Sequence, residues 1–221
     1  MNKIILFIVL SLFLFSPSLN FASQNHSIYI NRSTKKLHVL DGNGTIISTF
    51  DCGIGRGRLQ EKKSMGDYVT PTGDFIVDLI LSENGEFNQI SQLNKDKFES
   101  KKEYKKYLKD KVGLSKLFKN MNNIDFDNNQ RPDQAYGTAY IGLDSKDSIT
   151  GPKLNKYRNV VRWYSIGIHG TPNETNNISA SNSGGCIHLK ATDLKSIIEK
   201  GILNIGTKVK IGDEPLIEIR E

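Results

Sequence analysis

The sequence predicts a mostly β protein with a few short helices. Short runs that alternate apolar and polar residues, rich in β-branched and aromatic side chains, recur along the chain between turns that contain glycine, asparagine or proline. Only two stretches show the three- to four-residue apolar spacing of a helix. We find no internal repeat and no domain linker, so the pattern predicts one domain with one sizeable core.

The first 23 residues form a segment of their own. A positive charge at Lys3 precedes a mainly apolar run over residues 4–15, which small residues follow. This arrangement predicts a secretory signal peptide over residues 1–23, because the apolar run is shorter than the ~20 residues that span a bilayer. An uncleaved anchor is the alternative. The mature protein, residues 24–221, is therefore expected in the periplasm or cell envelope.

The N-terminal half predicts a series of strands. Residues 27–31 and 36–40 alternate in polarity, and the turn sequence DGNG at 41–44 leads into a third strand over 45–50. A further strand is expected over residues 74–81.

Residues 95–121 change character and predict two short amphipathic helices, the first ending at Gly113. Over residues 94–119, ten lysines face four acidic residues, a net charge of +6, so the excess charge of the chain is concentrated here. An exported protein without a base-reading motif is not expected to bind nucleic acid. The Lys-rich stretch 95–119 would suit an anionic wall polymer or membrane surface, and a solvated helix face is the alternative.

The C-terminal half returns to β structure around one more helix. Thr192 or Asp193 is expected to cap that helix and Gly201 to end it. Residues 173–183 are polar and predict a loop. Strands are predicted over residues 136–143, 164–168, 207–211 and 215–219.

The residues with the clearest chemistry are His169 and Cys186. A cysteine acts as a nucleophile in its thiolate form, and a histidine nearby can take the proton. His169 ends one predicted strand and Cys186 begins the next element. The intervening loop would bring these ends together. Gly184 and Gly185 allow consecutive backbone N–H groups to converge on the negative oxygen of a tetrahedral intermediate.

Other interpretations of these residues stay open on chemistry alone. An exported protein with two cysteines often pairs them, so a Cys52–Cys186 disulfide is one. His169 could instead be a hydrogen-bonded core histidine. A zinc site of His169, Cys186 and His188 lacks the usual ligand spacing. A serine nucleophile in the loop before Cys186 has little support.

Two separated segments resemble the L,D-transpeptidase catalytic domain, also called the YkuD-type domain. They are residues 166–171 (IGIHGT) and 183–189 (SGGCIHL). Residues 28–56 are similar to the opening hairpin of that family, and residues 70–75 (TPTGDF) to its Thr-Pro-x-Gly-x-Phe element. The resemblance covers the mature chain except roughly residues 85–134, where the basic helical segment is inserted.

The resemblance implies a β-sandwich in which Cys186 attacks the amide before a terminal D-amino acid. His169 would be the base and then the acid, and the Gly170 carbonyl would orient its ring. Gly184, Gly185 and Cys186 would supply the oxyanion hole. Substrate binding is assigned to His188, Ser183 and Thr171, with Ser183 expected to shape the loop and His188 replacing the arginine or asparagine usual in the family. Neither a cofactor nor a metal is implied.

The resemblance further implies action on the peptide stems of peptidoglycan and inhibition by carbapenems. Transfer to an amine is the leading interpretation. An L,D-carboxypeptidase or hydrolase of the same family is the first alternative, and a non-catalytic wall-binding module with a Cys52–Cys186 disulfide is the second. The basic helices are hypothesised to cover the mouth of the active site.

Overall fold

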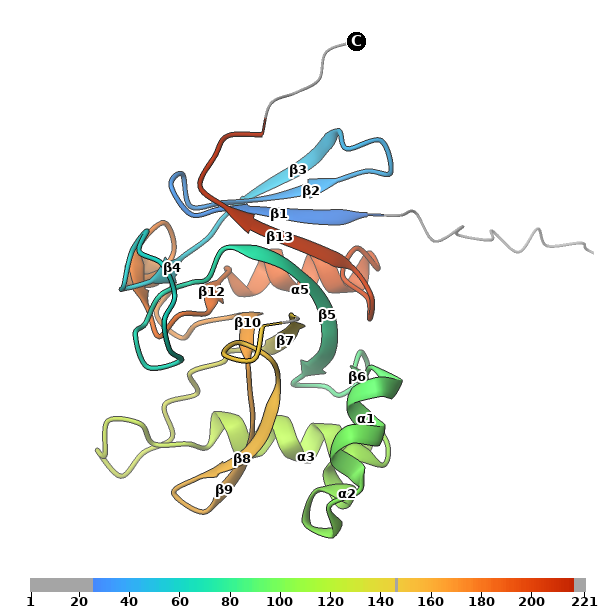
Figure 1. The fold of residues 1–221 in the computed structure, drawn as a ribbon. Helices are drawn as coiled ribbons and strands as arrows, with labels where there is room; N and C mark the ends of the chain where they lie inside the picture. Colours follow the sequence, from blue (N-terminus) through green and yellow to red (C-terminus); the bar gives the residue numbers. More distant parts are fainter. Residues whose placement is uncertain (1–25, 146, 217–221) are drawn as a thin grey trace, which may run out of the picture.

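The structure is a computed structural model that describes residues 26–145 and 147–216, so the predicted signal peptide lies outside the described residues. Nine strands form one sheet in the order β12-β10-β7-β5-β13-β1-β2-β3, with β6 paired to β5 (Figure 1). The mostly β prediction is confirmed. These strands are β1 Ser27–Asn31, β2 Lys36–Leu40, β3 Ile46–Asp51, β5 Gly73–Ser82, β6 Gln89–Ile90, β7 Ala139–Asp144, β10 Ile166–His169, β12 Ile187–His188 and β13 Lys208–Gly212.

Two smaller sheets and five helices complete the described part of the chain. One small sheet pairs β4 (Ile54–Gly55) with β11 (Ser181–Ser183), and the other pairs β8 (Lys153–Tyr157) with β9 (Val160–Tyr164). The helices are α1 Gln92–Glu99, α2 Lys102–Leu108, α3 Lys111–Asn122, α4 Glu174–Asn177 and α5 Ala191–Glu199.

Strand β5 gives the large sheet its curled, sandwich-like form. Its first residues, Gly73–Ile76, pair with β13, and the rest pairs with β7. The register shifts between Val77 and Leu79, and such a bulge bends a strand and increases its twist (Figure 1). Strand β5 therefore passes from the β13-β1-β2-β3 half of the sheet to the half that ends in β10 and β12.

The main hydrophobic core lies inside this curl. Alternate residues of β1, β2, β5, β7 and β13 point into it, and helix α5 adds Leu194, Ile197 and Ile198. Gly201 follows α5 with a φ of +65°, as expected for a residue that ends a helix. The predicted cap of this helix is wrong: its N-cap is Lys190, which makes no side-chain capping bond.

Residues 92–122 form three helices rather than the two that we predicted. Asp110 caps α3 by accepting a hydrogen bond from the Gly113 N–H at 2.9 Å, so Gly113 lies inside a helix instead of ending one. A Cβ atom there would lie 2.6 Å from the Lys106 carbonyl oxygen. Glycine therefore allows α3 to pack closely against α2.

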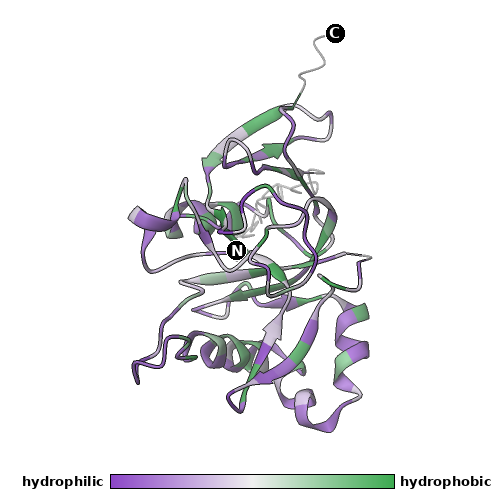
Figure 2. Ribbon diagram, turned by 60° about the vertical axis from the view of Figure 1, so that its left-hand side comes forward, coloured by the Kyte–Doolittle hydropathy of each residue, from purple (hydrophilic) through white to green (hydrophobic). Residues whose placement is uncertain are grey.

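The three helices have their own core, which joins them to the sheet. Phe98 of α1 packs edge-on against Trp163 of β9, with ring centroids 5.3 Å apart. Hydrophilic and hydrophobic residues are mixed along these helices (Figure 2), as expected for segments with one buried side. The insertion is thus packed on the rest of the domain through a buried core of its own.

The hairpin of β8 and β9 was not predicted, apart from Tyr164. Its two-residue turn, Arg158-Asn159, has positive φ at both positions and no glycine to signal it. The predicted strand 136–143 begins later, at Ala139, after a turn at Gly137. Of the predicted strand 215–219, Pro215 and Leu216 lie in no strand, and the remainder is outside the described range. Across residues 26–145 and 147–216, none of the helices has the length and apolarity to cross a bilayer.

Candidate active site

The candidate site lies at the paired ends of β10 and β12. These strands are parallel, with Ile168 opposite Ile187 and His169 opposite His188. Side chains alternate between the two faces of a strand, so His169, His188 and the preceding Cys186 share one face. All three line a pocket of about 700 Å³. The fold therefore brings the predicted nucleophile and the predicted base to one cavity.

His169 is held by the residue that follows it. Its Nδ1 lies 2.6 Å from the Gly170 carbonyl oxygen. A carbonyl only accepts hydrogen bonds, so Nδ1 carries the proton and Nε2 is left as the basic nitrogen. Burial and, to a smaller extent, the charge of His188 lower the pKa of His169 to about 3, and the bond to Gly170 opposes both. The imidazole is therefore neutral and ready to accept a proton.

The half-buried Cys186 lies next to Gly167 of β10, which has no side chain. Its sulfur lies 3.9 Å from the Ser165 carbonyl oxygen. Burial raises the pKa of the Cys186 thiol to about 11, while the Gly167 N–H and the Lys62 charge oppose this increase. Among the described residues, no hydrogen bond joins this sulfur to His169. Thiol and imidazole are thus both neutral, and the proton has to move when a substrate is attacked.

The turn before Cys186 is fixed by hydrogen bonds. The Ser183 hydroxyl donates to the Cys186 carbonyl at 2.5 Å and accepts from the Gly185 N–H at 3.0 Å. The Thr70 hydroxyl donates to the Gly185 carbonyl at 3.0 Å. Gly185 has a φ of +119°, and a Cβ there would lie 3.0 Å from the Val69 carbonyl oxygen. Ser183 therefore fixes this turn through both of its hydrogen bonds.

These bonds correct the predicted oxyanion hole. The Gly185 N–H already donates to Ser183, so it does not point freely into the pocket. Within residues 26–145 and 147–216, no partner is found for the N–H groups of Gly184 and Cys186. Two of the three predicted donors therefore stay available.

Thr171 and His188 occupy different parts of the pocket wall. The Thr171 hydroxyl accepts from the Asn177 side chain at 2.6 Å and so holds the loop around α4. The His188 ring lies edge-on to His169 with centroids 4.8 Å apart, and its buried Nδ1 lacks a partner among the described residues. Burial lowers the pKa of His188 to about 4. His188 is therefore a neutral neighbour of the base.

The sequence did not reveal several residues of the pocket. Tyr136 and Tyr140 pack on His169 with ring centroids 5.1 and 5.9 Å away, and the Tyr140 hydroxyl bonds to Ser165. Lys62, which is close enough to affect the thiol, is held by Asp67 at 2.9 Å. Arg162 lines the pocket from β9. Loops and the unpredicted hairpin supply most of these side chains, so only the tyrosines of the predicted strand 136–143 could have been suspected.

The two cysteines are both free, which argues against the disulfide alternative. Cys52 lies in the main core, is 0% exposed and is not among the residues that line the pocket. A larger cavity of about 930 Å³ opens between β1, β5 and β13, but the described residues around it include neither a cysteine nor a histidine. The chemistry therefore points to the smaller pocket.

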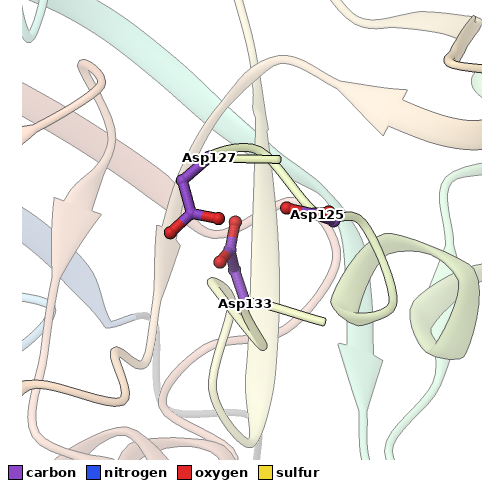
Figure 3. Close-up of side chains that lie close together, drawn as sticks. All are labelled: Asp125, Asp127 and Asp133. Atoms are coloured by element: carbon purple, nitrogen blue, oxygen red, sulfur yellow. The ribbon is translucent and has the colours of Figure 1, made fainter. Parts of the chain in front are cut away.

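The geometry does not favour zinc at this site. Zinc ligands in proteins come from histidine, cysteine, aspartate and glutamate. In the described part of the chain, the only group of three or more of these residues with ligand atoms within 4.8 Å of one another is Asp125, Asp127 and Asp133 (Figure 3). These half-buried or exposed carboxylates accept N–H groups of their own loop, as Asp133 does from Phe126 at 2.6 Å and Asp125 from Gln130 at 2.9 Å. Such hydrogen bonds account for the arrangement, and we assign no metal to it.

The basic helices do not cover the pocket. Helices α1–α3 contribute no lining residue, whereas the loop that contains Phe126 and Tyr136 and the β8–β9 hairpin do. The hypothesis that the Lys-rich stretch 95–119 forms the mouth is therefore wrong. This stretch packs on β5 and β9 instead.

Three solved structures are similar to this chain at low identity. Pgp2, the helical cell shape determining protein of Campylobacter jejuni, is 15% identical with a TM-score of 0.49, covering 88% of this chain and 49% of that one. L,D-transpeptidase 3 of Mycobacterium tuberculosis is 12% identical with a TM-score of 0.44, covering 86% and 61%. Bd1075 of Bdellovibrio bacteriovorus is 16% identical with a TM-score of 0.45, covering 86% and 49%. The chain thus spans about half to three-fifths of these structures.

The sequence itself gives the family. A search of curated proteins found no match. The family model of the L,D-transpeptidase catalytic domain (YkuD) matches residues 25–211, which include β1 to β12, all but the last residue of β13 and every residue of the pocket. This chain therefore belongs to the L,D-transpeptidase catalytic domain family.

Proposed function

We propose that this protein is an exported enzyme that cleaves and re-forms peptide bonds in peptidoglycan stems through a thioester on Cys186. The observation that carries the proposal is the shared face of His169 and Cys186 in one pocket. The free thiols and the orientation of His169 by Gly170 support it further.

In the first step, Cys186 attacks the carbonyl carbon between the L-centre of the diamino acid and the terminal D-amino acid. The thiol proton passes to Nε2 of His169 as the S–C bond forms. The N–H groups of Gly184 and Cys186 stabilise the negative oxygen. His169 then gives its proton to the departing amine as the C–N bond breaks, which leaves a thioester.

In the second step, a side-chain amine of another stem attacks the thioester. His169 takes a proton from that amine, and the thiol regains it as the S–C bond breaks. If water attacks instead, the same residues perform an L,D-carboxypeptidase reaction. Because thiol and imidazole are neutral at rest, His169 acts as a general base during attack, in contrast to enzymes with a preformed thiolate.

The test is to incubate the mature protein with disaccharide-tetrapeptide fragments and measure all masses. We expect a protein adduct equal to the stem without its terminal residue, free D-alanine, and cross-linked dimers. Release of D-alanine without dimers would assign the chain to the hydrolytic class. If neither the protein adduct nor released D-alanine were detected, the proposal would be contradicted.

We also propose that the exposed side of α1–α3 contacts an anionic wall polymer or membrane surface. Nine of its ten lysines are exposed, and the surface lies apart from the pocket lining. Replacing Lys101, Lys105 and Lys109 by glutamine should weaken salt-sensitive binding to isolated cell walls without changing cleavage of soluble fragments. Unchanged binding would contradict this contact.

A further inference from the structure

Arg162 contributes a permanent positive charge to the pocket wall. It lies on β9, is half-buried, and is the only arginine or lysine among the described residues that line the cavity. Arg162 and Tyr164 are two residues apart, so they share one face of β9, and both line the cavity. Asp133 is the only carboxylate in this lining. The cavity is otherwise walled by aromatic, small and neutral polar side chains.

The guanidinium of Arg162 is positioned but not neutralised. Its central carbon lies 4.3 Å from the Tyr164 ring centroid and 4.8 Å from that of Tyr157. Its Nε donates to the Asn155 side chain at 3.1 Å. In the described part of the chain, Arg162 forms no ion pair, and besides Asn155 its side chain has only the Tyr136 phenol as a hydrogen-bond partner. A planar donor fork is thus held in place without a carboxylate partner.

This fork lies in the neighbourhood of the reacting sulfur. Burial raises the pKa of Tyr136, the Cys186 charge raises it further, and Arg162 lowers it. Burial raises the pKa of Tyr164 as well, with Arg162 opposing this effect and Cys186 adding to it. The two phenols therefore lie within the fields of both groups. The sulfur and the guanidinium also line the same pocket of about 700 Å³.

The proposed reaction places a carboxylate in this pocket. The leaving residue is a terminal D-amino acid, and its free carboxylate lies no more than ~4 Å, one residue, beyond the scissile amide. An unpaired arginine fork matches a carboxylate with two parallel hydrogen bonds. We infer that Arg162 binds the free carboxylate of the leaving residue and so restricts cleavage to stems that end one residue beyond the scissile bond. This inference rests on the proposed function.

Binding can be measured without catalysis. Trp163 is the only tryptophan and lines the pocket, so its fluorescence reports occupancy. In the Cys186→Ala background, we would titrate a tetrapeptide stem with a free C-terminal carboxylate and the same stem as its C-terminal amide. We expect the acid to bind ~10–100-fold more tightly than the amide, because a charge-assisted bidentate pair is lost in the amide.

Variants separate recognition from support of the fold. Arg162→Gln should weaken binding of the acid ~10–100-fold and leave the amide unchanged, whereas Arg162→Lys should keep part of the preference. Arg158→Gln is the matched control, because Arg158 is in the same hairpin, exposed, and not part of the pocket. The Arg158→Gln substitution should change the binding of neither the acid nor the amide. Melting temperatures of all variants monitor folding.

Equal binding of acid and amide would overturn the inference. An Arg162→Gln variant that binds both ligands equally less tightly would also overturn it, because Arg162 would then only support the fold by packing between Tyr157 and Tyr164. The same ligands given to the Cys186-containing protein test the proposed function separately. Turnover without acid preference would sink the carboxylate site alone. Arginine-dependent acid preference without turnover would leave the site standing and sink the proposed reaction.

Discussion

The two cysteines of this chain differ less in acidity than in surroundings. Burial raises the pKa of Cys52 to about 12 and that of Cys186 to about 11. Cys52 is fully enclosed between β3 and β4 and packs in the main core. Cys186 is half-buried at a pocket that also holds a neutral imidazole. Access and a nearby base distinguish a nucleophile from a core residue here, whereas a depressed thiol pKa does not.

The charges next to each thiol sharpen the contrast. After burial, the Asp51 charge raises the pKa of Cys52, and Lys35 and Lys36 oppose it. For Cys186 the Gly167 N–H and Lys62 both favour the thiolate. The backbone of Cys52 is also used for structure, since its N–H donates to the Lys35 carbonyl at 2.9 Å. One region is built for packing, and the other can accommodate a developing negative charge.

The largest difference is expected in turnover. Cys186→Ala removes the nucleophile and should lower kcat/KM for stem cleavage by at least ~10³-fold, because nothing else in the pocket can form the thioester. Cys52→Ala is the matched control and should stay within about threefold of wild type. Comparable losses in the two variants would erase the distinction drawn above.

Alkylation should separate the thiols by ~100-fold in rate. Iodoacetamide should modify one cysteine per native chain, Cys186, and the second only in urea, because Cys52 is inaccessible. As the Cys186 pKa is about 11, its rate should rise about tenfold per pH unit from pH 7 to pH 10. A rate independent of pH over this range would mean a preformed thiolate and would contradict general-base attack. Modified peptides are identified by mass.

Sequence reasoning could assign chemistry to Cys186 and His169 because strand ends, glycines and spacing are local. It could not assign Cys52, since the same two-cysteine count fits a disulfide, a core thiol or a nucleophile. Its fate depends on which elements enclose it, and that is a non-local property. The same limit applies to Arg162: the hairpin that carries it is positioned by packing of Trp163 against Phe98, some sixty residues earlier in the chain.

The prediction of strands succeeded where polarity alternates and turns contain glycine. It failed for the helices over residues 92–122 because Gly113 serves close helix packing and not helix termination. Gly185 was wrongly counted among the free N–H donors for a similar reason, since the bond from its N–H to Ser183 depends on how the turn folds back. Residue type alone leaves these roles undetermined.

Core packing around Cys52 should appear in stability and not in catalysis. Cys52→Ser places a hydroxyl in an apolar cluster and should lower the free energy of unfolding by ~1–3 kcal/mol. Urea unfolding measures this, with kcat/KM expected to stay within about twofold of wild type. Cys186→Ser serves as the comparison, with a smaller stability cost because Cys186 is half-buried. A Cys52→Ser protein as stable as wild type would show that the site is less tightly packed than described.

The smallest expected effect concerns the acid limb of the pH profile of kcat/KM, which is the range where kcat/KM falls as pH decreases. His169 must be neutral to accept the thiol proton, so kcat/KM falls as pH decreases through its pKa of about 3. Part of this depression comes from the charge of His188, whose own pKa is about 4. His188→Asn removes that repulsion and should move the limb upward by no more than ~1 unit. His38→Asn, on β2 and away from the pocket, should leave it in place.

The measurement has to be separated from acid unfolding. Both buried imidazoles bind protons more readily in the unfolded chain, where their pKa is 6.5, so their neutral burial costs stability progressively as pH falls from about 6.5. Circular dichroism at each pH identifies the range in which the fold persists, and rates are compared only there. A wild-type limb near pH 6.5, or one that His188→Asn leaves unmoved, would mean that His169 titrates as an exposed imidazole. The pocket at Cys186 would then be open to water, and the contrast with the enclosed Cys52 would rest on the nucleophile's access alone.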